Sequence, residues 1–146
     1  MEDSQELTSK PKKNKLDFKE SKYATGRRKT SIAKVWLKKG SGIIHVNGKS
    51  YDSYFKRENH KMQLLRPFEL INQSSIYDVK CSVSGGGMTG QLGAMVLGIS
   101  KALLLFDPEL KHALKKEKLT TRDSRSVERK KYGRRKARRS FQFSKR

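Results

Sequence analysis

Residues 83–106 constrain the fold most, because a short strand pattern runs there through three consecutive glycines into a long helical pattern. Apolar side chains recur every three or four residues, at Leu92, Met95 or Val96, Ile99, Ala102 or Leu103, and Phe106. This spacing predicts an apolar stripe about 100 degrees wide on a helix of roughly five turns. The rest of the chain must therefore supply a sheet that covers the stripe.

The same helix carries a second row of very small residues. The row consists of Gly90, Gly93 or Ala94, and Gly98, and it ends at Lys101. Because glycine inside a helix costs about 1 kcal/mol relative to alanine, the row predicts close approach of another backbone. That backbone is either a neighbouring protein element or a phosphate chain. The bare amides of residues 85–87, near a helix N-terminus where anions are favoured, support the second alternative.

Alternation of apolar and polar residues predicts strands elsewhere. Structure is expected to begin at Tyr23, and residues 30–38 alternate as a half-buried strand. After the turn at residues 40–42, residues 43–46 are predicted to return as the second strand of an antiparallel hairpin, followed by a turn at Asn47-Gly48. Residues 77–83 show the clearest strand pattern.

Helices are predicted in two further segments. Residues 51–65 lack the two-residue alternation and suggest two short helices closed by Pro67. Asp107 followed by Pro108 is a strong helix start signal, and it predicts a short helix that runs to about Leu119. Residues 1–22 contain too few large apolar groups to order themselves and are interpreted as a flexible extension.

The charge of the chain points to a polyanionic partner. The formal net charge is +21, from 35 Lys and Arg against 14 Asp and Glu, and residues 122–146 hold 12 basic and 2 acidic residues. Such a field repels itself unless a polyanion neutralises it. A membrane is the poorer partner, because the basic tail has no sustained apolar face and no run of 18 or more apolar residues exists. Nucleic acid is therefore favoured.

The cellular setting is constrained by what the sequence contains. The single cysteine, Cys81, excludes an internal disulfide framework and fits a reducing compartment. The N-terminal segment lacks the apolar core of a secretory signal, and its five acidic residues argue against an intact organelle transit peptide.

Several motifs resemble catalytic or cofactor sites without completing them. Gly85-x-Gly87-x-x-Gly90 matches the dinucleotide-binding fingerprint, but the required second strand ending in an acid is missing, because Asp107 starts a helix. Gly48-Lys49-Ser50 resembles the end of a P-loop, yet Ile43 stands where its first glycine belongs, so a hairpin turn is predicted.

No catalytic or metal-ligating group emerges from the remaining residues. The histidines at 45, 60 and 112 share no ligand spacing, and Cys81 occupies an inward strand position typical of a small core residue. The chain is therefore not expected to be an enzyme, and no cofactor or metal is expected.

The tail, residues 122–146, is suited to RNA. Many of its cations are arginines, which can donate two hydrogen bonds to one phosphate and stack on a base. Tyr132, Phe141 and Phe143 add flat apolar faces that can stack on bases. Fully extended, 25 residues reach on the order of 80 Å. A large folded RNA whose shape fits both the domain and the tail is the favoured target, and a disordered solubility tail is the alternative.

With these residues in place, the chain resembles the small-subunit ribosomal protein S-nine family (universal class u-S-nine), in its bacterial or organellar form. The resemblance covers residues 23–146, and its most specific part is Gly85-Gly86-Gly87-x-x-Gly90-Gln91-x-x-Ala94-x-x-x-Gly98-x-Ser100-Lys101-Ala102-Leu103. Four further segments agree in order: Tyr23-x-Thr25-Gly26-Arg27-Arg28-Lys29, Leu119-Thr120-Thr121-Arg122-Asp123, Glu128-Arg129-Lys130-Lys131-Tyr132-Gly133 and Gln142-Phe143-Ser144-Lys145-Arg146.

The resemblance implies an α+β fold, a single two-layer domain with a mostly four-stranded mixed sheet covered by helices. This architecture is like the second domain of ribosomal protein S-five. It implies an RNA-binding domain at residues 23–121 and a long extended basic tail at residues 122–146. Residues 1–22 are longer than the family's usual leader, and nothing in the resemblance assigns them a role.

The resemblance also implies partners and sites in the ribosome of the bacterial cytoplasm or of an organelle. The expected partners are ribosomal RNA of the 3′ major domain in the small-subunit head, neighbouring head proteins and the peptidyl-site transfer RNA. Residues expected to bind ribosomal RNA are Arg27, Arg28, Lys29, Gly85, Gly86, Gly87, Arg122, Arg125, Arg129, Lys130, Lys131, Arg134, Arg135, Lys136, Arg138 and Arg139. Those expected to bind transfer RNA are Ser144, Lys145 and Arg146. The alternative function is a free-standing nucleic-acid chaperone or DNA-compacting protein.

Overall fold

The computed structural model of the protein describes residues 19–72 and 75–144. Most of the predicted N-terminal extension and the predicted transfer-RNA contacts Lys145 and Arg146 lie outside the described residues.

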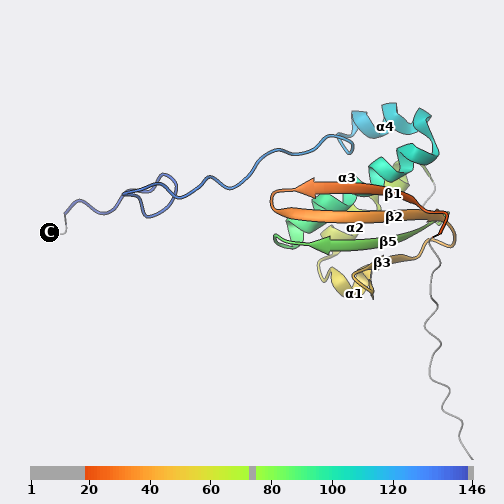
Figure 1. The fold of residues 1–146 in the computed structure, drawn as a ribbon, viewed down its shortest axis with the longest axis horizontal. Coiled ribbons are helices and arrows are strands. Elements are labelled where there is room, and N and C mark those ends of the chain that lie inside the picture. The colour runs from red at the N-terminus through yellow and green to blue at the C-terminus, as the bar shows by residue number, and fades with distance from the viewer. Residues whose placement is uncertain (1–18, 73–74, 145–146) are drawn as a thin grey trace, which may run out of the picture.

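A mixed five-stranded sheet with helices on one side forms the domain (Figure 1). In chain order the elements are β1 (Lys22–Arg28), β2 (Ser31–Lys39), β3 (Ile44–Val46), β4 (Lys49–Ser50), α1 (Tyr51–Tyr54), α2 (Glu58–Leu70), β5 (Tyr77–Ser84), α3 (Met88–Phe106), a 3-10 turn (Pro108–Leu110) and α4 (Lys111–Lys116). The strand order is β1-β2-β5-β3-β4. The predicted α+β class and the long helix are confirmed, and the two-residue β4 is the fifth strand.

The sheet differs from the prediction in two places. β1 was not anticipated as a strand, and it pairs antiparallel with β2 along its whole length. The predicted hairpin between residues 30–38 and 43–46 is wrong, because β2 pairs with β5, and β3 lies parallel to β5 on its other side. The loop that carries the chain across the start of β5 is held by Asp78, whose Oδ1 accepts hydrogen bonds from the amides of Ser41 and Ile43, both at 2.9 Å.

The helices also end differently from the prediction. Pro67 does not close α2 but lies inside it, and it is buried with Leu64 and Phe68. An interior proline costs about 3 kcal/mol, and apolar burial against the core offsets that cost. The predicted helix to about Leu119 ends at Lys116, because Lys118 adopts a left-handed conformation with φ of 58°.

The apolar stripe of α3 is buried, and the small-residue row lies against strand β1. Leu92, Met95, Ile99 and Leu103 are at most 1% exposed. A Cβ added to Gly26 of β1 would lie 1.8 Å from the carbonyl oxygen of Ala94 and 2.6 Å from the amide nitrogen of Gly98. Of the two alternatives for the row, close packing of a protein element is the one observed.

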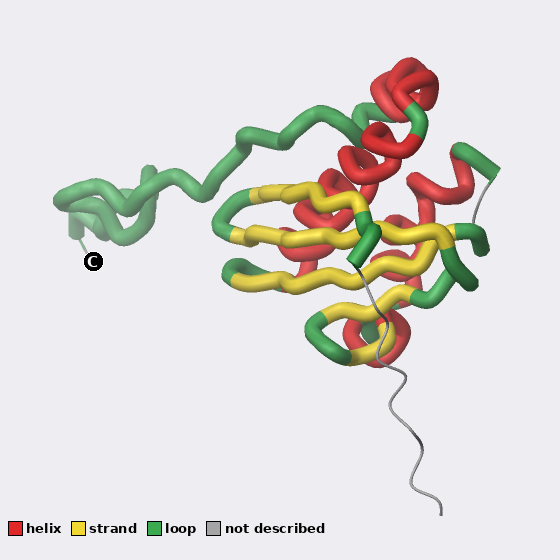
Figure 2. Tube along the Cα trace, turned by 45° about the vertical axis from the view of Figure 1, so that its right-hand side comes forward, coloured by secondary structure: helices red, strands yellow, loops and turns green. Residues whose placement is uncertain are grey.

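Helix α3 is long enough, and at a mean hydropathy of 1.4 apolar enough, to cross a membrane by length and composition alone. Figure 2 shows it lying across the back of the sheet, and ten of its 19 residues are buried. These features are those of a core helix.

Candidate nucleic-acid interface

The three-glycine turn and the turn between β1 and β2 lie together at one end of the sheet. Gly85 and Gly86 have φ of 73° and 62°, a region that favours glycine. A Cβ on Gly85 would lie 2.6 Å from the carbonyl oxygen of Thr30, and Ser31 Oγ donates a 3.1 Å hydrogen bond to the carbonyl oxygen of Gly85. The exposed backbone of residues 85–87 therefore lies next to the basic segment that ends β1.

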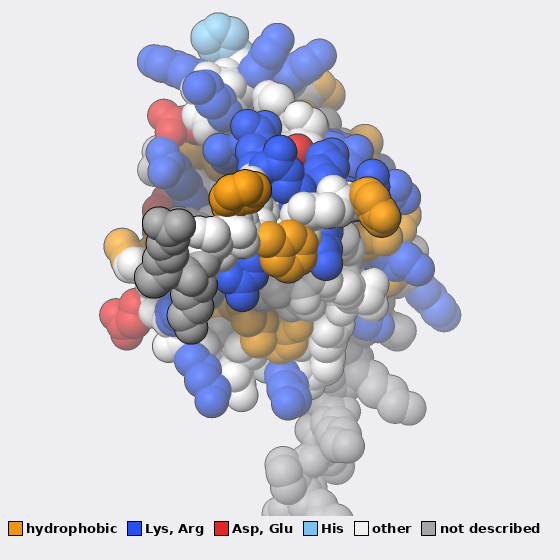
Figure 3. Space-filling view, turned by 90° about the vertical axis from the view of Figure 1, so that its left-hand side faces the viewer, with side chains coloured by type: hydrophobic (Ala, Val, Ile, Leu, Met, Phe, Trp, Pro, Cys, Tyr) orange, Lys and Arg blue, Asp and Glu red, His pale blue; other side chains and the backbone are white. Residues whose placement is uncertain are grey.

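Seen from this end, Lys and Arg side chains gather across the upper part of the molecule (Figure 3). Three of the predicted cations, Arg27, Arg28 and Lys29, belong to the end of β1 and the turn that follows it. Alternation along β1 sends Arg27 outward and Arg28 toward α3. Neighbouring cations on two faces of one strand can contact separate phosphates.

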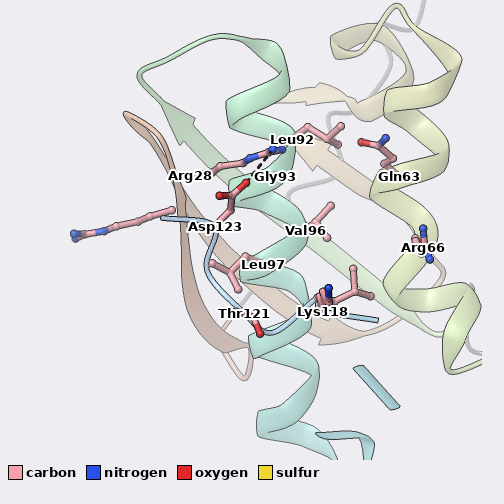
Figure 4. Close-up of a pocket in the computed structure, with 12 residues that line it drawn as sticks. Arg28, Gln63, Arg66, Leu92, Gly93, Val96, Leu97, Lys118, Thr121 and Asp123 are labelled. Atoms are coloured by element: carbon pink, nitrogen blue, oxygen red, sulfur yellow. Dashed lines mark hydrogen bonds and ion pairs between the residues drawn. The ribbon is translucent and has the colours of Figure 1, made fainter. Parts of the chain in front are cut away.

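The side chain of Arg28 lies along α3 and holds the beginning of the tail. A Cβ on Gly93 would come within 2.3 Å of Arg28 Cδ, so Gly93 leaves the space that the arginine occupies. Arg28 Nη2 contacts Asp123 Oδ2 at 3.3 Å (Figure 4). The contact joins β1 to the first residues after the helical part of the chain.

Asp123 is also bound by Arg125, so that two arginines share one carboxylate. Arg125 donates from Nε and Nη2 to the two carboxylate oxygens at 3.0 and 2.9 Å, and from its backbone amide at 3.1 Å. The hydrogen bonds from Arg125, with the nearby charge of Arg28 adding to them, hold the pKa of Asp123 well below its usual range. The carboxylate is therefore ionised whenever the protein works near neutral pH.

A hollow of about 240 Å³ opens beside this cluster, between α2, α3 and the segment after α4 (Figure 4). The polar residues that line it are Arg27, Arg28, Gln63, Arg66, Lys118, Thr121 and Asp123. Arg66 forms an ion pair with Glu117, which ties α2 to the end of α4. Among the described residues, Arg28 Nε is buried without a hydrogen-bond partner. The rest of the lining is apolar, and its polar part consists mostly of hydrogen-bond donors, which suits an anionic group such as a phosphate.

Beyond the cluster, the tail leaves the domain and then closes a loop (Figure 1). The Arg135 amide donates to the carbonyl oxygen of Arg139 at 2.8 Å, and Arg138 Nε contacts Glu128 Oε2 at 2.9 Å. No helix or strand occurs in residues 121–144. The cationic side chains of the loop are exposed, as are Tyr132 and Phe143.

The predicted site residues thus fall into two groups. One end of the domain brings together Arg27, Arg28, Lys29, Gly85, Gly86 and Gly87, with Arg122 and Arg125 at the root of the tail. Arg129, Lys130, Lys131, Arg134, Arg135, Lys136, Arg138 and Arg139 lie farther along the tail, and Ser144 is the last described residue. The roles of Asp123 and Glu128 were missed. The available signal was that they are the only two acids in the tail.

The predictions that Cys81 is a core residue and that Gly48 lies in a hairpin turn are confirmed. Cys81 is 2% exposed in the core, and burial raises its pKa to about 12, which leaves the thiol protonated. Gly48, with φ of 79°, lies in the tight turn between β3 and β4. In the described ranges, no three His, Cys, Asp or Glu side chains converge as metal ligands would.

A small α+β domain that carries a polycationic tail from a basic end of its sheet has the features of an RNA-binding protein. Residues 26–146, which make up most of the chain, match the family described as Ribosomal protein S9/S16. The protein therefore belongs to the ribosomal protein S9/S16 family, as the resemblance to the S-nine family indicated. It is a small-subunit ribosomal protein of a structural, non-enzymatic class, and its partners are ribosomal RNA and the ribosome.

Proposed function

We propose that the protein binds the 3′ major domain of ribosomal RNA in the small-subunit head and carries its tail to the peptidyl-site transfer RNA. It would do so in a bacterial or organellar ribosome, next to other head proteins. Residues 23–121 form the RNA-binding domain, residues 122–146 form the tail, and residues 1–22 are an extension without an assigned role. The observation that carries the proposal is the Arg28–Asp123–Arg125 cluster, which fixes where the tail leaves the domain.

The domain end supplies a geometrically defined anion site. The amides of residues 85–87 are exposed at the N-terminus of a 19-residue helix, where the helix dipole favours negative charge. Arg27 and Lys29 are exposed beside them. Backbone amides on a rigid turn select phosphates by position, so this end gives the protein a fixed location on a folded RNA.

The tail supplies reach and electrostatic affinity. Its basic residues from Arg129 to Arg139 bind ribosomal RNA along the path, and Ser144, Lys145 and Arg146 contact the transfer RNA. If six phosphates are neutralised, log K falls with log salt at a slope of about −4 to −5. Affinity of this kind is largely insensitive to sequence, so the place where the tail acts depends on the domain that holds its root.

Deletion of residues 143–146 tests the role of the tail. We expect the truncated protein to enter reconstituted small subunits normally, while transfer RNA at the peptidyl site is bound more weakly. Each lost phosphate or stacking contact contributes about 1 to 3 kcal/mol at most, so the loss should be graded. A K115A/K116A double variant removes the same number of cations from the end of α4, and it should leave transfer RNA affinity unchanged.

Two results would contradict the proposal. Unchanged transfer RNA affinity of the truncated subunits would remove the peptidyl-site role of the tail. Sedimentation of a cell extract tests whether the protein is bound stably to the small subunit, and we expect it to remain with small subunits at high salt. If it washed off completely at modest salt and bound duplex DNA equally well, a free-standing nucleic-acid chaperone would be the better function.

A further inference from the structure

The face of the sheet opposite α3 carries an ordered set of aromatic, basic and hydroxyl side chains. In the ranges 19–72 and 75–144, no helix crosses this face, which is turned toward the viewer in Figure 1. Alternation places Tyr23 and Thr25 of β1, Lys34 and Trp36 of β2, and Lys80 of β5 on it. None of these five was assigned a role by the sequence.

The strand register arranges these residues in cross-strand rows. Tyr23 pairs with Trp36, and Trp36 pairs with Lys80, so that one row crosses three strands. Adjacent strands lie about 4.8 Å apart, which makes the row about 10 Å long. The next row, two residues along each strand and about 7 Å away, consists of Thr25, Lys34 and Ser82.

The aromatic row is already organised. The ring centroids of Tyr23 and Trp36 are 5.3 Å apart with an interplanar angle of 44°, and Tyr23 is 45% exposed. Lys80 Nζ lies 6.0 Å from the centroid of the Trp36 ring, at the outer limit for a cation–π contact. A rigid aromatic pair with a cation beside it offers a stacking surface for a flat group that carries negative charge nearby.

The charge of this face favours RNA over a protein as its occupant. Arg27, Lys34, Lys38 and Lys80 lie at outward strand positions, against the single acid Asp78 among the described strands. The Oδ1 atom of Asp78 is occupied by the amides of the loop before β3. Lysine is depleted from the cores of protein–protein interfaces, whereas cations interleaved with aromatic side chains are typical of single-stranded nucleic-acid surfaces.

We propose that the open sheet face is a second RNA site, on which an unpaired nucleotide stacks against Tyr23 and Trp36. Lys34 and Lys80 contact its phosphates, and the hydroxyls of Thr25 and Ser82 are placed to bond ribose or phosphate oxygens. An unpaired nucleotide fits, because a duplex keeps its bases stacked on one another and presents no free base face to the aromatic pair. The inference rests on the proposed RNA-binding function and adds a surface that neither the tail nor the three-glycine turn provides.

Trp36 is the only tryptophan of the chain, so its fluorescence reports directly on this face. The full-length protein is titrated with a single-stranded oligouridylate of eight nucleotides, and binding is followed in parallel by anisotropy of a labelled oligonucleotide. We expect saturable quenching of Trp36 emission. Heparin, a polyanion without bases, should compete electrostatically while producing little quenching, and a blunt RNA duplex should behave like heparin.

Variants separate this face from the tail. Replacement of the exposed Lys34 in K34Q, alone and combined with K80Q, should reduce the salt slope of single-strand binding, by about 1.4 for the double variant. Y23A should weaken the quenching interaction by about 5- to 150-fold. M62A is the matched control, because Met62 is 65% exposed on α2, away from the strands. Circular dichroism establishes that each variant is folded.

Two outcomes would overturn the proposal. If anisotropy shows that the oligonucleotide binds while Trp36 emission stays constant, the RNA is held elsewhere, and the proposed tail function survives. If a photo-cross-linking probe at residue 23 in assembled small subunits reaches a protein rather than RNA, the occupant is a protein. A cross-link from this position to RNA supports the proposal.

Discussion

Replacement of Gly26 by alanine should destabilise the folded domain while leaving the RNA affinity of the tail in place. Gly26 lies in β1 where α3 approaches most closely, and an added Cβ would stand 1.8 Å from the Ala94 carbonyl oxygen and 2.6 Å from the Gly98 amide nitrogen. Both neighbours are backbone atoms of a buried helix, so no side-chain rotation can relieve the contact. Strand and helix must move apart by at least 1.2 Å to reach even a tight 3.0 Å separation.

The cost can be placed near the upper end of the range for overpacking. Extra methylene groups in a packed core typically cost about 1 to 3 kcal/mol, and that range includes clashes relieved by side chains. Alanine also restricts the unfolded chain, which returns about 0.4 to 1 kcal/mol at a compatible position. A net loss of about 2 to 2.6 kcal/mol is therefore expected, out of a typical total of about 5 to 15 kcal/mol. For a domain of this size it corresponds to a fall in Tm of at least about 8 °C.

Urea unfolding monitored by Trp36 fluorescence and by circular dichroism measures the loss. We expect a lower midpoint at an unchanged m value, which identifies a change in stability rather than in the surface exposed. G87A is the matched control, because Gly87 has φ of −106° and nothing within 4 Å of an added Cβ. A G26A midpoint that coincides with the wild type would refute the packing argument.

The same variant carries a functional expectation. The root of the tail is held by Arg28 of β1, but the electrostatic affinity of the exposed tail cations does not require the packing of β1 against α3. Partly unfolded G26A should therefore still bind unrelated RNA. Incorporation into small subunits, which needs the domain, should fail at temperatures above the lowered Tm. If incorporation persisted after the domain had unfolded, the tail alone would be sufficient to bind the protein to the small subunit.

The remaining expectations concern two titratable groups. The folded-state pKa of Asp123 is depressed, so its contacts are fully formed above its unfolded value of 3.8 and are lost as pH falls through the folded pKa. In a carbon-detected NMR titration R125Q should raise that pKa more than R28Q does, and equal shifts would contradict the dominance of Arg125. For Cys81, whose pKa is raised to about 12 by burial, alkylation at pH 8 should be negligible in the native protein and should follow the rate of unfolding. Rapid labelling without unfolding would show that the thiol is accessible.

The parts of the fold that could be predicted were those with long, regular patterns. The helical spacing in residues 88–106 and the alternation in residues 77–83 each specify one element with one buried face. The position of β5 at the centre of the sheet could not be predicted from the local sequence, because the same turn residues are compatible with a hairpin between β2 and β3. The pairing of β2 with β5 depends on long-range contacts, in particular the Asp78 carboxylate that holds the loop before β3.

Strand β1 was missed for a related reason. Its inward positions are Ala24, Gly26 and Arg28, a series too small and too polar to read as the buried face of a strand. These small residues are required there because α3 lies directly against them. A close approach of helix and strand therefore weakens the apolar alternation by which a strand is recognised.

The residue composition of the candidate site could be predicted from the sequence, but its spatial arrangement could be predicted only in part. Clustered arginines and three glycines indicate anion binding without showing which cations stand together. That Arg28 crosses α3 over Gly93 and reaches Asp123, 95 residues later in the chain, depends on the tertiary fold. An acid in a basic tail lowers the net charge of the tail only slightly, so a count of charges gives it little weight. In the structure this acid marks the point at which the tail is fixed.

The second acid of the tail indicates how the tail meets its RNA. Glu128 contacts Arg138 at 2.9 Å and Lys131 at 3.6 Å, and it helps to close the loop that contains Arg134 and Arg135. Exposed ion pairs of this kind contribute about 0 to 1 kcal/mol each, and salt weakens them. A row of phosphates offers the same cations many partners and releases counterions as it binds. The loop should therefore open on the RNA, so the RNA determines the path of the tail beyond its fixed root.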